Sequence, residues 1–560
     1  MYRLFLLVVA MLAATGSSAF AQSTNAAAPD VLRLYQVTDV GELPPTTSLP
    51  LLLVMKYQHE SELRALVESQ STPGSPMFHH YLTKDQFVAS YAPTAAAYAQ
   101  AVAKLQGAGF RVTTSDPDRN MIGVQAPVSV INRYFSTSIH RVLTNGRSAF
   151  ANVKSVTIPA ELPDVLSVNG LDNVALLRAQ VIPADLSKAP KSHMLRPYSL
   201  SPNAIGGPPN GPSGQGYGPS AIASAYNIPA NYGYTGAGRR IGIVGGGNFL
   251  DSDLQSYLSY FQVNRTGPTY REPTNGGGVF NPNDSNQSLE AILDVTTIAG
   301  LAPGAIIDFK NAPAPLSSPN FLQEINELLG ITGPQVDVIS ISFGACEGNK
   351  MFDDGIDSYA LRASSQGTSI VASSGDQGYY GCGGFSQQNK VNSPASNPNV
   401  LAIGGTSPNT ETVNTLGYAA QYAWTGSGGG SSARFARPYW QQYNVPGSKR
   451  GVPDVSFAAD GNYYAFLYFN NQPSGGYGTS WATPIWASIQ AEINQEQGRY
   501  HGSAGASLYN AFRTYGYSSG TPPMFNDITA GNTGGYYAAP GWDFTTGVGS
   551  ANGQRLSSVE

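Results

Sequence analysis

The chain has 560 residues, which at roughly 150 residues per domain predicts two or three domains with room for buried cores. Charged residues make up only 12% of it, about half the usual share of roughly 25%, and this excludes a charge-rich disordered protein. The net charge of −5, from 36 acidic and 31 basic residues, offers no basic stripe for nucleic acid and no polybasic surface for anionic lipid. Both classes of partner are therefore excluded.

The amino terminus has the three-part layout of a secretory signal peptide. Arg3 precedes an apolar run from Leu4 to Ala14, and small residues follow up to Ala19-Phe20-Ala21. Because the run is shorter than the ~20 residues that cross a bilayer, a transmembrane helix is the weaker interpretation. We expect residues 1–21 to be removed and the protein to be secreted, either outside the cell or into the periplasm.

Residues 22–186 mix short strands with amphipathic helices, which predicts an α+β domain. Helices are expected at 94–107 and 128–135, and strands at 51–55, 110–114 and 121–125. The next segment, 187–219, contains seven prolines and six glycines and offers no apolar face to bury. It is interpreted as an exposed linker, the kind of segment in which chains are cut.

From residue 220 to 560 the pattern alternates between buried strands and helices. Short β-branched runs are typical of strands buried on both faces, and they lie at 240–244, 306–309, 336–343, 369–373 and 400–403. Helical stretches are expected at 252–261, 288–300, 320–329 and 353–365. This alternation predicts an α/β domain on a doubly wound parallel sheet, with functional residues at the carboxyl ends of its strands.

Histidine is nearly absent from this second domain. Five of the six histidines precede it, and the last, His501, lies in a polar stretch flanked by glycine that predicts a solvated surface residue. If the domain is an enzyme, carboxylates would carry its proton transfers, which favours activity at acid pH.

Two short motifs supply candidate catalytic groups. Gly478-Thr479-Ser480 places a serine at the start of a helix whose free N–H groups could receive an oxyanion, with a turn and a serine cap as the alternative. Glu290 and Asp294 are four residues apart, on one face of a largely apolar helix. A solvated acidic face is the alternative there, but a buried pair that shares a proton is the usual source of carboxyls that act as base and acid below neutrality.

These motifs closely resemble those of the sedolisins, or serine-carboxyl peptidases, with kumamolisin-like members nearest. The second domain carries them in the family's order: Glu290 to Asp294, Leu301-Ala302-Pro303-Gly304-Ala305, Val338-Ile339-Ser340-Ile341-Ser342-Phe343-Gly344, Ser374-Gly375-Asp376, Pro394-Ala395-Ser396-Asn397-Pro398, Gly404-Gly405-Thr406 and Gly478-Thr479-Ser480. The first domain resembles the family's activation propeptide, through His80-Tyr81-Leu82-Thr83, Phe87, Tyr91-Ala92-Pro93, Gly109-Phe110 and Phe135-Ser136-Thr137-Ser138-Ile139-His140.

The resemblance implies a subtilisin-like catalytic domain behind an α+β, ferredoxin-like propeptide. It implies that Ser480 attacks the scissile carbonyl, that Glu290 takes the serine proton, and that Asp294 holds and tunes the glutamate. Asp376 matches the oxyanion-hole aspartate, which can donate a hydrogen bond only when it is protonated. An Asx turn is the alternative role for Asp376.

Two positions depart from the family pattern. Many relatives carry an extra glutamate after the first strand of the catalytic domain, linked to the catalytic pair, where this chain has Ile243-Val244-Gly245-Gly246-Gly247. That support is expected to be missing. Phe343 replaces the tryptophan of the kumamolisin pattern, which keeps an apolar ring but loses an indole N–H. Phe343 and Gly344 are expected to bind substrate.

Near the carboxyl end, Asp527 and Asp543 bracket a glycine-rich loop. Such a loop can supply the six or more hard oxygens that calcium prefers, although aspartate and glycine also simply form turns. The resemblance implies one structural Ca²⁺, held by these two carboxylates and by the carbonyls of Ile528, Ala539 and Gly541.

The chain has only two cysteines, Cys346 and Cys382. In an exported protein a lone pair most often forms one disulfide. Neither lies near a histidine in the sequence, so a thiol nucleophile or a zinc site is the poorer interpretation.

Together these features predict a monomeric, secreted, acid-active endopeptidase that hydrolyses proteins or peptides. Its own propeptide is expected to inhibit it until acidification weakens charge pairs between the domains and the chain cuts itself within 187–219. A non-catalytic exported binding protein is the alternative, disfavoured because all four catalytic groups are present. An esterase is disfavoured because Ser480 lacks a Gly-x-Ser-x-Gly setting.

Overall fold

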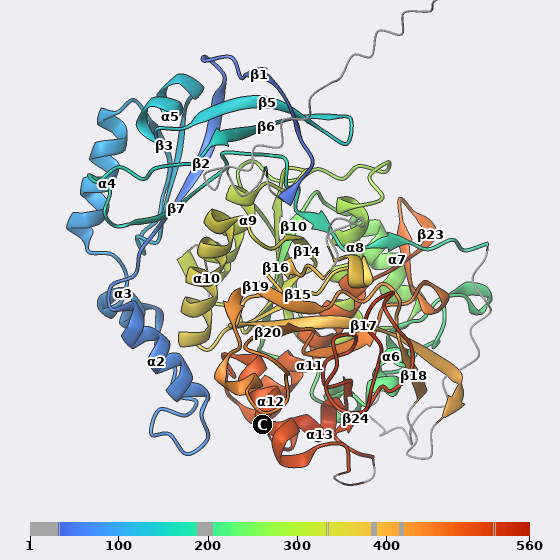
Figure 1. Ribbon diagram of the computed structural model, residues 1–560. Coiled ribbons are helices and arrows are strands. Elements are labelled where there is room, and N and C mark those ends of the chain that lie inside the picture. The colour runs from blue at the N-terminus through green and yellow to red at the C-terminus, as the bar shows by residue number, and fades with distance from the viewer. Residues whose placement is uncertain are drawn as a thin grey trace, which may run out of the picture.

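The computed structural model describes residues 32–559 apart from 33, 188–204, 332, 334, 382–388, 414–418, 519 and 521. An amino-terminal α+β domain lies against a larger carboxyl-terminal α/β domain (Figure 1). The predicted signal peptide, Cys382 and the first part of the predicted linker lie outside the described residues. Among those that are described, no helix combines the length and apolarity needed to cross a bilayer.

The amino-terminal domain is built on a four-stranded antiparallel sheet with the ferredoxin-like order predicted for it. The order is β3 (Arg111–Ser115), β4 (Met121–Pro127), β2 (Ser48–Met55) and β7 (Val165–Asn169). Residues of α4 (Ala95–Gly107) and α5 (Val128–Tyr134) share a core with one face of this sheet. The remaining elements are α2 (Glu60–Ser71), α3 (Lys84–Ser90) and a second sheet of β1 (Thr38–Glu42), β5 (Ser138–Thr144) and β6 (Arg147–Lys154).

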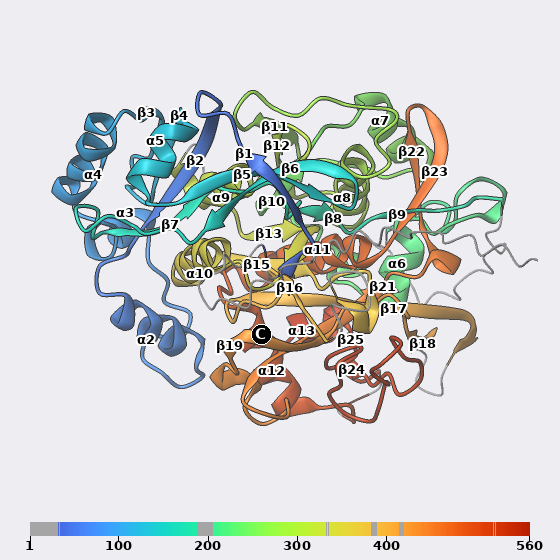
Figure 2. The ribbon, with the colours of Figure 1, turned by 45° about the horizontal axis from the view of Figure 1, so that its top comes forward.

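The carboxyl-terminal domain contains the predicted parallel sheet. Its strand order is β11 (Thr269–Pro273), β12 (Ile306–Ala312), β10 (Arg240–Gly246), β13 (Val338–Ile341), β15 (Ser369–Ser373) and β17 (Val400–Val413), followed by antiparallel β18 (Ala419–Ala423), with β21 (Val455–Ala458) also paired to β17. Two long helices, α8 (Gln287–Leu301) and α11 (Thr479–Gln497), pack against each other and the sheet. The pair α9 (Ser318–Asn326) and α10 (Lys350–Ser365) lies toward the amino-terminal domain (Figure 2).

Shorter elements complete this domain. The helices are α6 (Pro219–Tyr226), α7 (Asp251–Tyr260), α12 (Ala504–Tyr515) and α13 (Gly553–Ser557), and the strands are β14 (Phe343–Cys346), β16 (Asn392–Ser393), β19 (Gly430–Ala436), β20 (Lys449–Val452), β22 (Ala465–Phe469), β23 (Gln472–Tyr477), β24 (Phe525–Asn526) and β25 (Ser550–Ala551). In the described part of the predicted linker, Tyr217 is buried and donates its N–H to the Tyr464 carbonyl at 2.8 Å. That part packs on the carboxyl-terminal domain.

One predicted strand divides in two. The apolar run 336–343 forms β13, breaks at Ser342, and continues as β14, which leaves the parallel sheet and pairs with β16 and a short strand β8 (Arg178–Ala179). The hydrophobic pattern continues through the break, so it could not reveal the change of partner.

The two domains share a buried interface. Alternate residues of β2 face opposite ways: Leu51 and Leu53 join the amino-terminal core, while Leu52 and Val54 join the core of the carboxyl-terminal domain. Beside them, Arg362 of α10 is fully buried and forms an ion pair of 2.7 Å with Asp118 of the amino-terminal domain. The same apolar strand therefore stabilises its own domain and the docking of that domain.

The interface also corrects the prediction for His501. It was expected to be solvated, but only 1% of it is exposed, and its Nδ1 lies 2.7 Å from the Asn494 Oδ1 atom. Its ring meets the ring of His79 from the amino-terminal domain edge-on, with centroids 5.5 Å apart. The prediction was wrong because the residues that cover His501 lie more than 400 positions earlier in the chain.

The buried ion pair gives a test of the interface. Replacing Asp118 by alanine leaves the Arg362 guanidinium buried without its counter-ion, a change that costs about 3–5 kcal/mol in other proteins. We expect Asp118→Ala to lower the free energy of unfolding of the uncut chain by an amount on that scale, measured by urea denaturation in a Ser480→Ala background. Asp85→Ala, at an exposed position of α3, is the matched control. Equal stability of the two variants would contradict the role of the pair.

Candidate active site

Four sequence-predicted residues converge at the carboxyl edge of the parallel sheet. Glu290 and Asp294 lie on α8, Ser480 lies in the first turn of α11, and Asp376 follows β15. All are buried, with exposed fractions of 0%, 1%, 0% and 8% respectively. The structure therefore brings together the groups that the motifs singled out.

Ser480 and Glu290 form the central contact. The Ser480 hydroxyl donates to the Glu290 Oε2 atom at 2.6 Å. Asp294 Oδ1 accepts a hydrogen bond of 2.8 Å from the Ser342 hydroxyl. Ser342 also lies 3.3 Å from the Ser480 carbonyl, which lacks its usual helical donor because Pro484 has no N–H. Ser342 thus links the carboxyl pair to the first turn of α11, a contact that the sequence did not indicate.

Burial controls the protonation of this pair. Burial and then the charge of Asp294 raise the pKa of Glu290 well above its ordinary value, against a smaller opposite effect of the Ser480 hydrogen bond. Burial likewise raises the pKa of Asp294 well above its ordinary value. Ionising both of two adjacent buried carboxyls is costly in free energy, so the pair retains a proton at a pH where an exposed carboxyl has lost it.

Asp376 has two unlike carboxyl oxygens. Oδ1 accepts hydrogen bonds from the Thr479 N–H at 2.7 Å and from the Thr479 hydroxyl at 2.8 Å. Oδ2 is buried and has no hydrogen-bond partner among the described residues. Burial raises the pKa of Asp376 to about 7, although the two Thr479 hydrogen bonds act in the opposite direction. In acid Asp376 is therefore a neutral donor.

A segment that joins the two domains runs across these groups. Its first part, β8, pairs antiparallel with β14, and the Gln180 N–H donates to the Ser342 carbonyl at 2.9 Å. Its second part, β9 (Ile182–Pro183), pairs antiparallel with β23. Main-chain pairing on both sides is how an extended peptide binds to strand edges.

The carbonyl of Gln180 lies at the centre of the site. It accepts a hydrogen bond of 3.3 Å from the Ser480 N–H. Gly478 has a φ of 121°, and a Cβ there would lie 2.3 Å from both the Gln180 carbonyl oxygen and Asp376 Oδ2. Hence the Gln180 carbonyl oxygen, which accepts from the Ser480 N–H, and Asp376 Oδ2 both border the space beside Gly478, and only glycine leaves room for them. Nothing in the local sequence of 178–183 indicated this placement.

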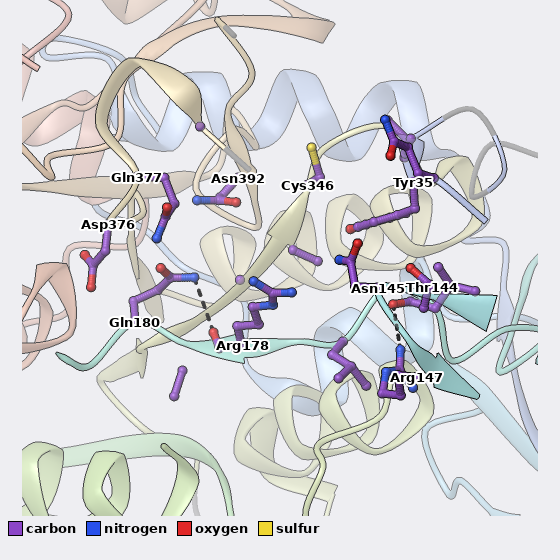
Figure 3. A pocket seen from close by; sticks show the side chains of 18 of the residues that line it. Tyr35, Thr144, Asn145, Arg147, Arg178, Gln180, Cys346, Asp376, Gln377 and Asn392 are labelled. Carbon is purple, nitrogen blue, oxygen red and sulfur yellow. Dashed lines mark hydrogen bonds between the residues drawn. The ribbon is translucent and has the colours of Figure 1, made fainter. Parts of the chain in front are cut away.

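A cavity of about 930 Å³ lies beside the crossing segment. Gln180, Asp376 and Gln377 lie at one end of it, while Tyr35 and Arg147 lie at the other (Figure 3). Much of its lining is polar, and it joins residues of both domains.

The two predicted substrate-binding residues lie on the strand that holds this segment. Phe343 is paired with Ala179, and Gly344 with Arg178. In the stretch 243–247, where the glutamate of many relatives is expected to be missing, Ile243 and Val244 are fully buried. A different carboxylate, Glu324 of α9, accepts a hydrogen bond of 3.1 Å from the Gly245 N–H. Within the described residues no hydrogen bond joins Glu324 to the Glu290–Asp294 pair.

The predicted calcium ligands form one loop. Asp527 accepts from the Gly541 N–H at 3.1 and 3.2 Å, and Asp543 accepts from the Ala539 N–H at 3.0 Å. The charge of Asp543, after the larger effect of burial, raises the pKa of Asp527, so the two carboxylates are close. In this part of the described chain the carbonyls of Ile528, Ala539 and Gly541 accept no hydrogen bond. Two close carboxylates and carbonyls without a hydrogen bond are the kinds of oxygen ligand that Ca²⁺ prefers.

Cys346 ends β14 at the rim of the site and is disulfide-bonded. Its predicted partner, Cys382, lies outside the described residues, so their pairing stays a prediction.

Comparisons with known proteins agree with this arrangement. Residues 35–174 match the family described as "Pro-kumamolisin, activation domain", and residues 276–510 match the subtilase family. The chain is 28% identical to sedolisin of Pseudomonas sp. over 92% of its own length and 88% of that protein, and 28% identical to kumamolisin of Bacillus sp. over 93% of each. A solved structure of Pseudomonas sedolisin, a serine-carboxyl proteinase in complex with pseudo-iodotyrostatin, matches with a TM-score of 0.53 and 28% identity, covering 61% of this chain and 97% of that one.

The predicted calcium site gives a second prediction. If Asp527 and Asp543 hold Ca²⁺ only in the folded state, calcium at 100 times its dissociation constant should add about 2.7 kcal/mol of stability. We expect a higher melting temperature with calcium than with chelator at pH 5, and a smaller difference as the pH falls, because protonated carboxyls bind metal poorly. Asp527→Asn should abolish the difference. An unchanged melting curve together with no calcium by elemental analysis would contradict the site.

Proposed function

We propose that this chain, which is similar to the sedolisins, or serine-carboxyl peptidases, over nearly its whole length, is a secreted, acid-active endopeptidase made as a self-processing precursor. The observation that carries the proposal is the hydrogen bond of 2.6 Å from Ser480 to Glu290, next to a peptide carbonyl bound by the Ser480 N–H. A nucleophile, its base and a bound carbonyl thus occupy one buried site. A binding protein without catalytic activity would not need this combination.

The proposed reaction starts at Ser480. Its Oγ attacks the carbonyl carbon of the scissile peptide bond, while its proton passes to Glu290. Asp294, next to Glu290 on the same face of α8, shares the proton of the pair and holds the glutamate in place. The oxyanion that forms accepts hydrogen bonds from the Ser480 N–H and from neutral Asp376.

Collapse of this intermediate breaks the C–N bond. Glu290 returns its proton to the leaving amine, and an ester of Ser480 with the acyl part of the substrate remains. A water molecule then attacks the ester and gives its proton to Glu290. Proton transfer back to Ser480 releases the carboxylic acid product and restores the enzyme.

The pH dependence follows from these roles. Asp376 must be neutral to donate, so activity is lost as the pH rises through the pKa of Asp376, which burial raises to about 7 with the cleft covered. On the acid side activity is lost when the Glu290–Asp294 pair takes up its second proton. We expect a bell-shaped profile of kcat/KM with an acidic optimum, measured on a peptide substrate. A maximum at pH 7 or above would contradict a carboxylate base.

Variants in the same assay separate the roles. Ser480→Ala and Glu290→Ala should each remove nearly all turnover, and the double variant should be scarcely worse than either, because the two groups act as a unit. Asp376→Ala should cost about 2.7–4 kcal/mol of transition-state stabilisation. Asp251→Ala, at an exposed position of α7, is the control.

The crossing segment supports self-processing. Because the Gln180 carbonyl lies at the Ser480 N–H and strands hold the chain on both sides, we place the first cut at the Gln180–Val181 bond. The covalent link keeps this bond in the site, which replaces a bimolecular encounter by an intramolecular step. This position lies upstream of the linker at 187–219 expected from composition.

Acidification of the precursor should therefore produce a chain that begins at Val181. We expect intact-mass analysis to find 181–560 as the first large product, with the Ser480→Ala precursor uncut. Val181→Pro keeps the segment but changes the bond, and it should slow the first cut or move it. A first cut within 187–219 while the Gln180–Val181 bond stays intact would overturn this assignment. Cutting of Ser480→Ala at the same rate would overturn self-processing.

A further inference from the structure

Thr479 lies between Gly478, whose φ makes room for two oxygens, and the nucleophile Ser480. Its side chain is fully buried. Its hydroxyl accepts a hydrogen bond of 3.2 Å from the Gly375 N–H and lies 2.8 Å from Asp376 Oδ1. A hydroxyl has one proton to donate and two lone pairs that accept. The Gly375 N–H uses one lone pair of the Thr479 hydroxyl, which leaves the hydroxyl proton to be donated to Asp376.

Two donors of Thr479 meet the same carboxyl oxygen. The N–H at 2.7 Å and the hydroxyl at 2.8 Å both point at Asp376 Oδ1. A carboxyl oxygen that already accepts two hydrogen bonds is a poor place for a proton, because an O–H there would face two other donors. The neutral acid therefore carries its proton on Oδ2.

Oδ2 is also the oxygen that borders the space occupied by the Gln180 carbonyl oxygen. It is buried, has no other hydrogen-bond partner among the described residues, and flanks the same point next to Gly478 as the Gln180 carbonyl oxygen. A proton on Oδ2 can be donated to that carbonyl, whereas a proton on Oδ1 would be directed at Thr479.

We propose that Thr479 is a positioning residue that assigns the proton of neutral Asp376 to Oδ2, the oxygen that faces the scissile carbonyl. The inference rests on the proposed role of Asp376 as an oxyanion donor. It gives Thr479 a function separate from that of Ser480: Ser480 supplies the nucleophile and a main-chain donor, and Thr479 orients the second donor without touching the substrate.

Loss of the Thr479 hydroxyl should lower the turnover and, at the same time, extend the active pH range on its alkaline side. Turnover should fall, because the proton is then distributed over both oxygens of Asp376. The alkaline limb of the pH profile should nevertheless move to higher pH, because the Thr479 hydrogen bonds lower the pKa of Asp376 and one of them is gone. A purely structural defect would lower activity without moving this limb.

The test uses the full chain, with each variant matured in acid by a trace of the unmodified enzyme that is then removed. For Thr479→Val we expect kcat to fall by on the order of 10²-fold, the scale for one oxyanion donor, with KM little changed and the alkaline limb at higher pH. Thr479→Ser keeps the hydroxyl and should restore both kcat and the limb. Thr479→Ala repeats the test without added bulk if valine prevents folding.

Thr483→Val is the matched control. Thr483 is a fully buried threonine on the same helix, and its hydroxyl donates to the Thr479 carbonyl at 2.8 Å. We expect its loss to lower the melting temperature but to leave the alkaline limb in place.

Three outcomes would overturn the inference. These are an unchanged kcat in Thr479→Val, a loss of kcat with an unmoved alkaline limb, and a failure of Thr479→Ser to restore activity. The proposed function fails separately, when Asp376→Ala keeps full activity. If Asp376→Ala is impaired and Thr479→Val is not, only the role of Thr479 is refuted.

Discussion

The carboxyl groups of Glu290, Asp294 and Asp376 are buried around Ser480, and no lysine or arginine among the described residues forms an ion pair with any of them. Burial without a counter-ion favours the neutral form, so these groups hold protons at a pH where exposed carboxyls have lost them. A carboxyl pair can then accept and return the serine proton, the role that histidine has in many serine peptidases. The same burial allows Asp376 to donate a hydrogen bond rather than only to accept one.

This environment depends on the amino-terminal domain. The crossing segment covers the site with its own main chain, and β2, Asp118 and the residues around His79 bury a second surface. The precursor is therefore held by two kinds of contact: strand pairing at the active site and a buried apolar and ionic interface on α10. The proposed cut at the Gln180–Val181 bond breaks the covalent link between the β8–β14 and β9–β23 pairings, while the interface on α10 contains no part of that segment.

The three residues of the Gly478-Thr479-Ser480 motif each have a different steric or chemical role. Gly478 leaves the space in which a carbonyl oxygen and Asp376 Oδ2 lie side by side. Thr479 binds the other oxygen of Asp376, and Ser480 presents its hydroxyl to Glu290. Helix α11 starts at this motif, so its first turn places these groups next to Ser342 at the end of β13.

Local periodicity and spacing were enough to predict the parallel sheet, the helices between its strands, and the common face of Glu290 and Asp294, since these depend on neighbours within a few residues. Ordered motifs also identified Ser480 and Asp376. The structure alone placed Gln180 at the Ser480 N–H, broke the apolar run at Ser342, and buried His501 beneath residues of the other domain. Each of these depends on contacts between residues 100 or more positions apart. A hydrophobic pattern does not specify which distant residues a strand or a side chain will contact.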